Sequence, residues 1–122
     1  MLEETNKLWK LADRRTGMNI LICDDEGFAA EKIVKLVSHS AVQHHLAVSV
    51  VKYTDVEKCL ASPLNQCDIA FFDIDMKPYN GIDLARKLHN ENPNAIIIFV
   101  TNYIEYALAG YEVNAFRYLL KP

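Results

Sequence analysis

The sequence predicts an α/β domain in which an open sheet is wound with right-handed crossovers. Short apolar segments alternate with segments of helical spacing from Asn19 to Leu120, which is the order expected when strands and helices form layers. Three of the apolar segments are nearly continuous runs, as in strands buried on both faces of a parallel sheet. The chain has 122 residues, 51% of them hydrophobic and 24% charged, and this suits one globular domain.

Five segments read as strands because they are short, apolar and separated by turn-forming or helical segments. They are residues 19–23, 46–51, 68–72, 95–100 and 115–120.

Four segments between these strands have helical spacing. The apolar stripe of the first consists of Phe28, Ile33, Leu36 and Val37. In the second, Thr54 and Glu57 have the S/T-x-x-E form of a capping box and open a short helix that ends at Leu60. The apolar stripe of the third consists of Ile82, Leu84, Ala85 and Leu88, and the fourth helix covers residues 103–110.

Composition argues against several classes of function. The chain carries 13 Lys and Arg against 16 Asp and Glu, a net charge of −3, so the basic footprint of a nucleic-acid-binding protein is missing. The longest apolar run, residues 95–100, is far short of the ~20 residues that cross a bilayer. We see no export signal and no membrane association. Three cysteines without C-x-x-C spacing indicate reduced thiols and a cytoplasmic location.

Polar residues follow four of the five predicted strands. Asp24, Asp25 and Glu26 follow the first strand, Asp73 and Asp75 the third, Thr101 the fourth and Lys121 the fifth. The carboxyl ends of parallel strands meet at one edge of an open sheet, where ligands bind. A tendency of polar residues to mark strand ends explains any one of these, but explains poorly why acids, a hydroxyl and a lysine share one edge.

These groups suit phosphoryl transfer. Clustered carboxylates repel one another unless a divalent cation lies among them, and an oxygen site with open positions suits Mg²⁺. A carboxylate can act as the nucleophile that accepts a phosphoryl group. Mg²⁺ and a lysine then neutralise the phosphoryl oxygens, while a threonine hydroxyl donates a hydrogen bond.

Four strings carry a family resemblance, namely LICDDE, FFDIDMKPYNG, IIFVTN and YLLKP. In order and spacing they resemble the receiver domains of bacterial two-component response regulators, over residues 19–122. The string FVTNYIEYALAGYEVNAFRYLLKP resembles receivers coupled to LytTR-type DNA-binding domains, the LytR/AlgR type. The resemblance implies a flavodoxin-like (CheY-like), doubly wound, five-stranded parallel sheet with strand order 2-1-3-4-5.

The resemblance also implies a role for each site residue. Asp73 would be the phosphoacceptor, assisted by Thr101 and Lys121. Mg²⁺ would be bound by Asp24, Asp25, Asp73 and the backbone carbonyl of Asp75. Thr101 and Tyr118 would form the switch that changes the surface of the fourth helix and fifth strand. The family usually has Pro directly after Met76, whereas here Lys77 precedes Pro78, which could alter the acceptor loop.

From the resemblance we expect a phosphoacceptor domain rather than an enzyme, with self-phosphorylation and autodephosphorylation as its only activities. Its partner would be a sensor histidine kinase. A homodimer could form through the face of the fourth helix and fifth strand, where Tyr106 and Tyr111 fit either core packing or a partner surface. Residues 18–122 would form the receiver, cut before the usual fifth helix and a DNA-binding output domain, so this fragment would not bind nucleic acid itself.

Residues 1–17 lie outside the resemblance and have the pattern of an amphipathic helix. Leu8, Leu11 and Ala12 share one stripe, which Trp9 and Leu2 widen. Acidic residues near the start, arginines near the end and a final Gly17 favour such a helix. We expect it to pack on the sheet face that a fifth helix would occupy, within one chain or by exchange between two.

Three alternatives remain open. Asp73-Ile74-Asp75 superficially matches the D-x-D motif of haloacid-dehalogenase-type phosphohydrolases, although that motif usually follows the first strand. A pseudo-receiver that binds partners without phosphorylation is the second, and the complete acid, hydroxyl and lysine set argues against it. A metal site at His39, His44 and His45 is the third, but no acid or cysteine lies at ligand spacing, so a solvated loop is the simpler reading.

Overall fold

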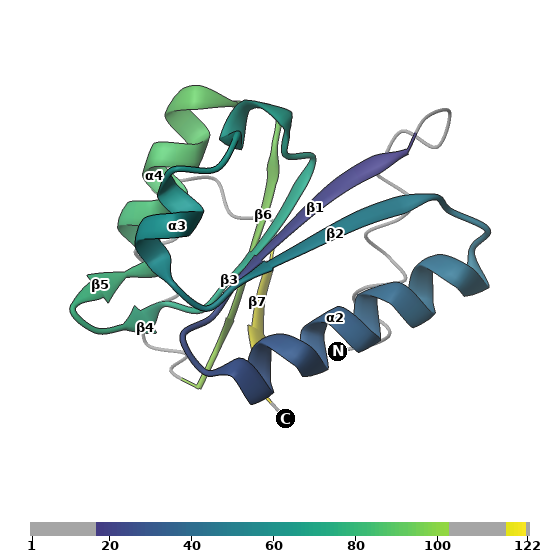
Figure 1. The fold of residues 1–122 in the computed structure, drawn as a ribbon, viewed down its shortest axis with the longest axis horizontal. Helices are drawn as coiled ribbons and strands as arrows, with labels where there is room; N and C mark the ends of the chain where they lie inside the picture. The colour runs from purple at the N-terminus through teal and green to yellow at the C-terminus, as the bar shows by residue number, and fades with distance from the viewer. Residues whose placement is uncertain (1–16, 103–116, 122) are drawn as a thin grey trace.

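A five-stranded parallel sheet forms the centre of the molecule (Figure 1). The computed structural model describes residues 17–102 and 117–121. The strand order is β2-β1-β3-β6-β7, and every pairing between neighbours is parallel. The strands are β1 (Met18–Cys23), β2 (Val48–Tyr53), β3 (Ile69–Phe72), β6 (Ile96–Thr101) and β7 (Arg117–Leu120). The predicted doubly wound fold, with its five strands in the order 2-1-3-4-5, is therefore confirmed.

Helices cover both faces of the sheet (Figure 1). On one face α2 (Gly27–Gln43) packs over β1 and β2. On the other face lie α3 (Val56–Leu60), the 3-10 turn η1 (Leu64–Gln66) and α4 (Gly81–Glu91). Alternate residues of β1 explain the two layers, since Ile20 and Ile22 join the core under α2 while Leu21 and Cys23 join the core under α3 and α4.

The first predicted helix forms, but its buried stripe differs from the expected one. The buried residues of α2 are Ala30, Ile33, Val37, Ser40 and Ala41. Phe28 is 77% exposed, so its assignment to the buried stripe was wrong. At 100° per residue, Phe28 lies about 200° around the helix from Ala30, on the opposite side. Leu36 is only partly buried.

The start of α3 also differs from the expectation. The N-cap is Asp55, whose carboxylate accepts hydrogen bonds from the backbone amides of Glu57 at 2.9 Å and Lys58 at 3.5 Å. The predicted capping box that began at Thr54 was therefore wrong by one residue. A carboxylate is an effective cap and also favours the positive end of the helix dipole. The predicted end of this helix at Leu60 is confirmed.

The third predicted helix is confirmed as α4, in which all four residues of the predicted stripe are buried. Its N-cap, Asn80, accepts a hydrogen bond from the Ile82 amide at 2.7 Å. A small antiparallel hairpin that the sequence did not predict, β4 (Asp75–Met76) with β5 (Tyr79–Asn80), lies directly before this helix. The hairpin joins the end of β3 to α4 and includes the Lys77–Pro78 step.

Three predictions fall outside the described residues: the N-terminal amphipathic helix at residues 1–16, the helix at residues 103–110, and the packing or partner role of Tyr106 and Tyr111. Within residues 17–102 and 117–121, no helix has the length and apolar character needed to span a membrane.

Candidate functional site

The site lies at the carboxyl edge of the sheet, where β1, β3, β6 and β7 end. Backbone hydrogen bonds continue the sheet one residue beyond the strands: the Asp24 amide donates to Tyr53 O at 3.1 Å, and the Asp73 amide donates to Cys23 O at 3.0 Å. The Lys121 amide donates to Thr101 O at 2.9 Å. These bonds hold the first polar residue after each strand in register, so side chains far apart in sequence meet at one edge.

Four carboxylates gather at this edge. Asp24, Asp25, Glu26 and Asp73 each offer an oxygen within 4.8 Å of the others. Asp24 is fully buried and Asp73 is 4% exposed, whereas Asp25 and Glu26 are exposed. Among the residues described, this donor set fits a hard divalent cation, because it offers only oxygen ligands and its exposed side leaves room for water.

Glu26 belongs to this cluster, although sequence reasoning named it only as a residue that follows the strand and gave it no ligand role. Its backbone amide donates to Asp24 Oδ1 at 3.0 Å, so the chain turns sharply after β1 and brings the Glu26 carboxylate back over the site. The signal in the sequence was the unbroken run of three acids, which could not show the direction of the turn.

Lys121 supplies the positive charge of the site. Its Nζ lies 2.9 Å from Asp24 Oδ2, 3.2 Å from Asp73 Oδ2 and 3.7 Å from Glu26 Oε1. Burial of the ammonium group opposes its charge, but the contacts with Asp24 and Asp73 outweigh this and raise the pKa of Lys121. The lysine therefore stays protonated and can face anionic oxygen atoms.

A backbone hydrogen bond fixes the carboxylate of Asp73, and its surroundings disfavour the charged form of that carboxylate. Its Oδ1 accepts a hydrogen bond from the Ile74 amide at 2.8 Å. Burial, and then the negative charge of Asp24, raise the pKa of Asp73 to about 6, although Lys121 acts in the opposite direction. Burial also raises the pKa of Asp25, with further contributions from Asp24 and Glu26. One lysine does not neutralise four acids, and a cation would relieve the remaining repulsion.

Gly81 lets α4 approach the acceptor loop. Its amide donates to Ile74 O at 2.7 Å, and a Cβ added here would lie 1.9 Å from the carbonyl oxygen of Asp73. Any larger residue must therefore push the helix away from the backbone that carries Asp73. The glycine keeps the end of β3, the hairpin and α4 tightly joined.

Three further residues were predicted to belong to the site: Thr101, Asp75 and Tyr118. Their burial and their distance from the acid cluster differ, as follows. Thr101 is the last residue of β6 and is buried. Asp75 is the first residue of β4 and is half-buried, and its carboxylate is not in the acid cluster of the described residues. Tyr118 lies in β7, where its backbone pairs with Phe99, but its side chain is outside the described part of the chain.

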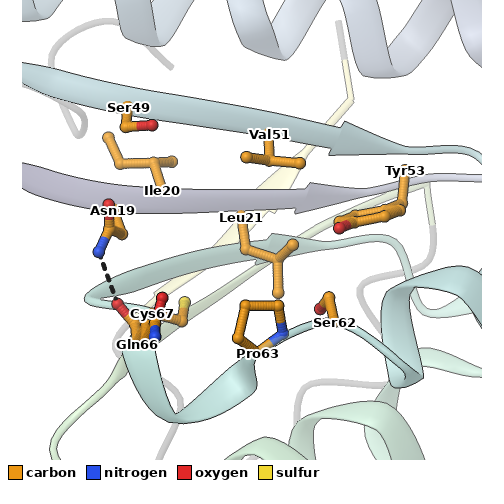
Figure 2. Close-up of a pocket in the computed structure, with 10 residues that line it drawn as sticks. All are labelled: Asn19, Ile20, Leu21, Ser49, Val51, Tyr53, Ser62, Pro63, Gln66 and Cys67. Carbon is orange, nitrogen blue, oxygen red and sulfur yellow. Dashed lines mark hydrogen bonds between the residues drawn. The ribbon is translucent and has the colours of Figure 1, made fainter.

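A pocket of about 220 Å³ elsewhere in the molecule does not have the chemistry of a phosphoryl site. Figure 2 shows it between β1, β2 and the segment around η1, where Nδ2 of the Asn19 side chain donates to Gln66 O at 2.9 Å. Apolar and uncharged side chains such as Leu21, Val51 and Pro63 line it. Because none of its lining residues carries a charge, it cannot neutralise a phosphoryl group.

Comparison with known sequences places these features in a family. The sequence profile of the response regulator receiver domain matches residues 20–122. The chain is 38% identical to sensory transduction protein LytT of Enterococcus faecalis and 36% identical to sensory transduction protein LytR of Streptococcus agalactiae, over 106 residues in each case. These matches cover 86% of this chain and 42% of each relative, so the chain spans less than half the length of these relatives.

Solved structures have the same fold. The response regulator TrrA of Thermotoga maritima, in complex with Mg²⁺ and BeF, superposes with a TM-score of 0.71 at 22% identity, covering 86% of this chain and 87% of that one. The response regulatory domain of protein mrkE from Klebsiella pneumoniae gives a TM-score of 0.68 at 29% identity, covering 86% and 84%.

Proposed function

The chain belongs to the response regulator receiver domains, and we propose that it accepts a phosphoryl group from a histidine kinase on the carboxylate of Asp73. The observation that carries the assignment is the position of Asp73, buried at the end of β3 within reach of both Lys121 and three further carboxylates. Asp24 shares the burial, the contact with Lys121 and a backbone hydrogen bond to its other oxygen, so the position of Asp73 at the end of β3, the middle strand of the sheet, is what distinguishes it.

We propose that the neighbouring side chains divide the work of the transfer. A carboxylate oxygen of Asp73 forms the bond to phosphorus as the bond from phosphorus to the donor breaks. Lys121 Nζ moves its contact from Asp73 Oδ2 to a phosphoryl oxygen, and the hydroxyl of Thr101 donates to another. Both interactions are strongest when negative charge develops on these oxygens in the transition state.

The acid cluster fits Mg²⁺, the ion present in the complex of TrrA. Asp24, Asp25 and Asp73 would hold it, together with the backbone carbonyl of Asp75. When bound, the ion supplies positive charge that neutralises the phosphoryl oxygens. Glu26 lies close enough to assist through a bridging water molecule.

The same arrangement supports self-phosphorylation from small acyl phosphates and slow autodephosphorylation, rather than turnover of an external substrate. A haloacid-dehalogenase-type hydrolase would need the second carboxylate of Asp73-Ile74-Asp75 at the reacting centre, and the acid cluster of the described residues does not include it. A pseudo-receiver would not need the contacts that Lys121 makes with Asp73 and Asp24.

We propose that this receiver controls a DNA-binding output domain, since a relative of which it covers 42% is named transcriptional regulatory protein LytR in Staphylococcus aureus. Phosphorylation would change the surface of β7 and of the helix predicted at residues 103–110, and this surface is the proposed site of homodimer formation. The free thiols of Cys23, Cys59 and Cys67 are in keeping with a cytoplasmic location.

Incubation with Mg²⁺ and acetyl phosphate, followed by intact mass measurement, tests the assignment. We expect one phosphoryl group per chain, none in Asp73→Asn, and none when EDTA removes the metal. Asp83→Asn, which changes an exposed aspartate on α4, is the matched control and should be phosphorylated like the parent. Equal phosphorylation of Asp73→Asn and the parent would overturn the proposal.

A further inference from the structure

Among the described residues, four sulfur-containing side chains gather in the core between the sheet and the helices α3 and α4. Cys23, Cys59, Cys67 and Met76 all belong to this buried cluster, and each is at most 6% exposed. They come from the end of β1, from α3, from the residue after η1 and from the β4–β5 hairpin. Only the packing of these segments on one face of the sheet brings the four side chains together.

Two contacts join three of these side chains. The thiol of Cys23 donates a hydrogen bond to Sδ of Met76 over 3.9 Å. The thiol of Cys59 is hydrogen-bonded to that of Cys23, and this contact, followed by burial, raises the pKa of Cys59. Cys23 therefore links the other two in a sulfur triad, defined as Cys23, Cys59 and Met76, whose members are at most 1% exposed.

Cys67 lies in the same core but outside the sulfur triad. Its thiol donates to Ile69 O at 3.3 Å, and in the described part of the chain the three thiols do not all lie within 4.8 Å of one another. Cys67 and Leu21 belong both to this core and to the lining of the pocket in Figure 2. That pocket offers a small ion a way into the core.

The spacing within the sulfur triad suits a metal ion with three sulfur ligands. Bonds from sulfur to a first-row d¹⁰ ion are about 2.3 Å long, so three sulfur atoms around such an ion in one plane lie about 4.0 Å apart. The distance between the sulfur atoms of Cys23 and Met76 is 3.9 Å. An ion can therefore bind both atoms without a change in their separation.

The chemistry of the sulfur triad selects a soft ion. Thiolate and thioether ligands favour Cu(I), whereas oxygen ligands such as those of the acid cluster suit Mg²⁺. A structural Zn²⁺ site has four ligands, and the buried triad supplies three. When one thiol loses its proton to solvent, its thiolate and a monovalent ion form a neutral pair, which an apolar core can hold more readily than a net charge.

We propose that Cys23, Cys59 and Met76 bind one soft monovalent metal ion, of the class of Cu(I) and Ag(I). The bound ion ties the end of β1, α3 and the β4–β5 hairpin to one another. The site adjoins the acid cluster along the chain, because Cys23 directly precedes Asp24. Its existence does not depend on phosphorylation, so a failure of the proposed function leaves it standing.

The first test adds one equivalent of Ag(I), which needs no reductant, to the full chain in chloride-free buffer. The three methionines carry ¹³C in their methyl groups, and Met76→Leu identifies the signal of Met76 by its loss. We expect Ag(I) to shift the signal of Met76 and to leave that of Met18, which is buried in the core under α2, in place. An unchanged Met76 signal would overturn the proposal.

The second test measures the affinity for Cu(I) by competition with bicinchoninate in the absence of oxygen. Met76→Leu and Cys59→Ala should each weaken binding at least about tenfold, because each removes a ligand. Met76→Leu nearly preserves side-chain volume, so its result stands even where Cys59→Ala lowers stability. Met18→Leu and Cys67→Ala are the matched controls and should bind Cu(I) like the parent.

Two outcomes of the competition would overturn the proposal. Parent-like affinity in Met76→Leu would show that the thioether is not a ligand. Equal losses in Cys67→Ala and Cys59→Ala would show that Cu(I) binds free thiols without a defined site.

Discussion

At the scale of single residues, the site depends on a buried excess of negative charge. Asp24 and Asp73 lie almost entirely out of solvent, and Lys121 is the cation that contacts both of them. Burying a carboxylate beside another carboxylate disfavours its charged form. This unfavourable burial of neighbouring carboxylates occurs at the edge of the sheet, where the same negative charges can bind a metal ion that in turn binds a phosphoryl group.

The first prediction concerns the stability of the metal-free protein. Because the pKa of Asp73 is raised from 3.8 to about 6, its charged form destabilises the folded state. This cost is absent below pH 3.8, grows as the pH rises towards 6 and is complete above it. Asp73→Asn should therefore be more stable than the parent at pH 7.5 in EDTA, by about 1–3 kcal/mol.

Urea unfolding at several pH values measures this difference. The stability gap between Asp73→Asn and the parent should narrow as the pH falls from 6 to 4. Mg²⁺ should raise the stability of the parent more than that of the variant, because the variant lacks one proposed ligand. A variant that is less stable than the parent at pH 7.5 would contradict this account.

At the scale of elements, the acceptor loop is positioned by the packing of α4 against the end of β3. The hairpin of β4 and β5 returns the chain to Gly81, whose amide bonds to Ile74 O. On the far side of the hairpin, the phenol of Tyr79 donates a hydrogen bond to Glu57 of α3. The loop is therefore held between two helices and the sheet.

The second prediction concerns Gly81. In Gly81→Ala the new Cβ would lie 1.9 Å from Asp73 O, and relief of this clash must move the backbone of either α4 or the acceptor loop. We expect a loss of about 2–3 kcal/mol or more in unfolding free energy and a slower rate of phosphorylation by acetyl phosphate.

Gly27→Ala provides the matched control for this substitution. A Cβ at Gly27, the first residue of α2, meets nothing within 4 Å, and alanine is the better helix former. Its stability should equal or slightly exceed that of the parent in the same urea titration. Similar losses in both variants would show that the close approach at Gly81 is unimportant.

At the scale of the whole molecule, parallel topology creates the site. The register of β1, β3, β6 and β7 places the ends of four strands at one edge, although their residues span almost the entire described sequence. The face of the sheet under α2 includes Ile69, Phe71 and Ile98 in addition to β1 residues, whereas α2 packs mainly against β1 and β2.

The third prediction concerns residues 1–16, which the structure does not describe and which remain predicted as an amphipathic helix. We propose that the apolar stripe of this segment, with Leu8, Leu11 and Trp9, packs on the part of the sheet face formed by β3 and β6. About 15 helical residues extend ~22 Å, close to the ~20 Å of a six-residue strand. Deletion of residues 2–16 should therefore lower the melting temperature by about 5 °C or more.

Substitution of Leu8 and Leu11 by serine offers a milder form of the same test, since it keeps the length of the chain. Lys7 and Lys10 substituted by serine are the control, because they lie off the apolar stripe. Circular dichroism and size-exclusion chromatography would follow melting and association. A deletion variant that stays monomeric and melts like the parent would contradict the prediction.

Local sequence was sufficient to predict the strands, the helix stripe at Ile82, Leu84 and Leu88 and the polar residues after each strand. Apolar runs and turn signals depend on near neighbours, so they can be read without the fold. Boundaries were less well determined. Asp55 rather than Thr54 caps α3, because two adjacent residues could each serve as cap and the direction of chain entry decides between them.

Only the tertiary structure decided which side chains meet at the site, how exposed they are and how their pKa values change. Whether Glu26 turns towards Asp73, or Phe28 towards solvent, depends on how α2 leaves the sheet, and no local pattern encodes that angle. The raised pKa of Asp73 likewise arises from burial and from Asp24, 49 positions away in the sequence. The sequence by itself determined the elements and the chemistry at their ends, while the packing of those elements set distance, exposure and charge.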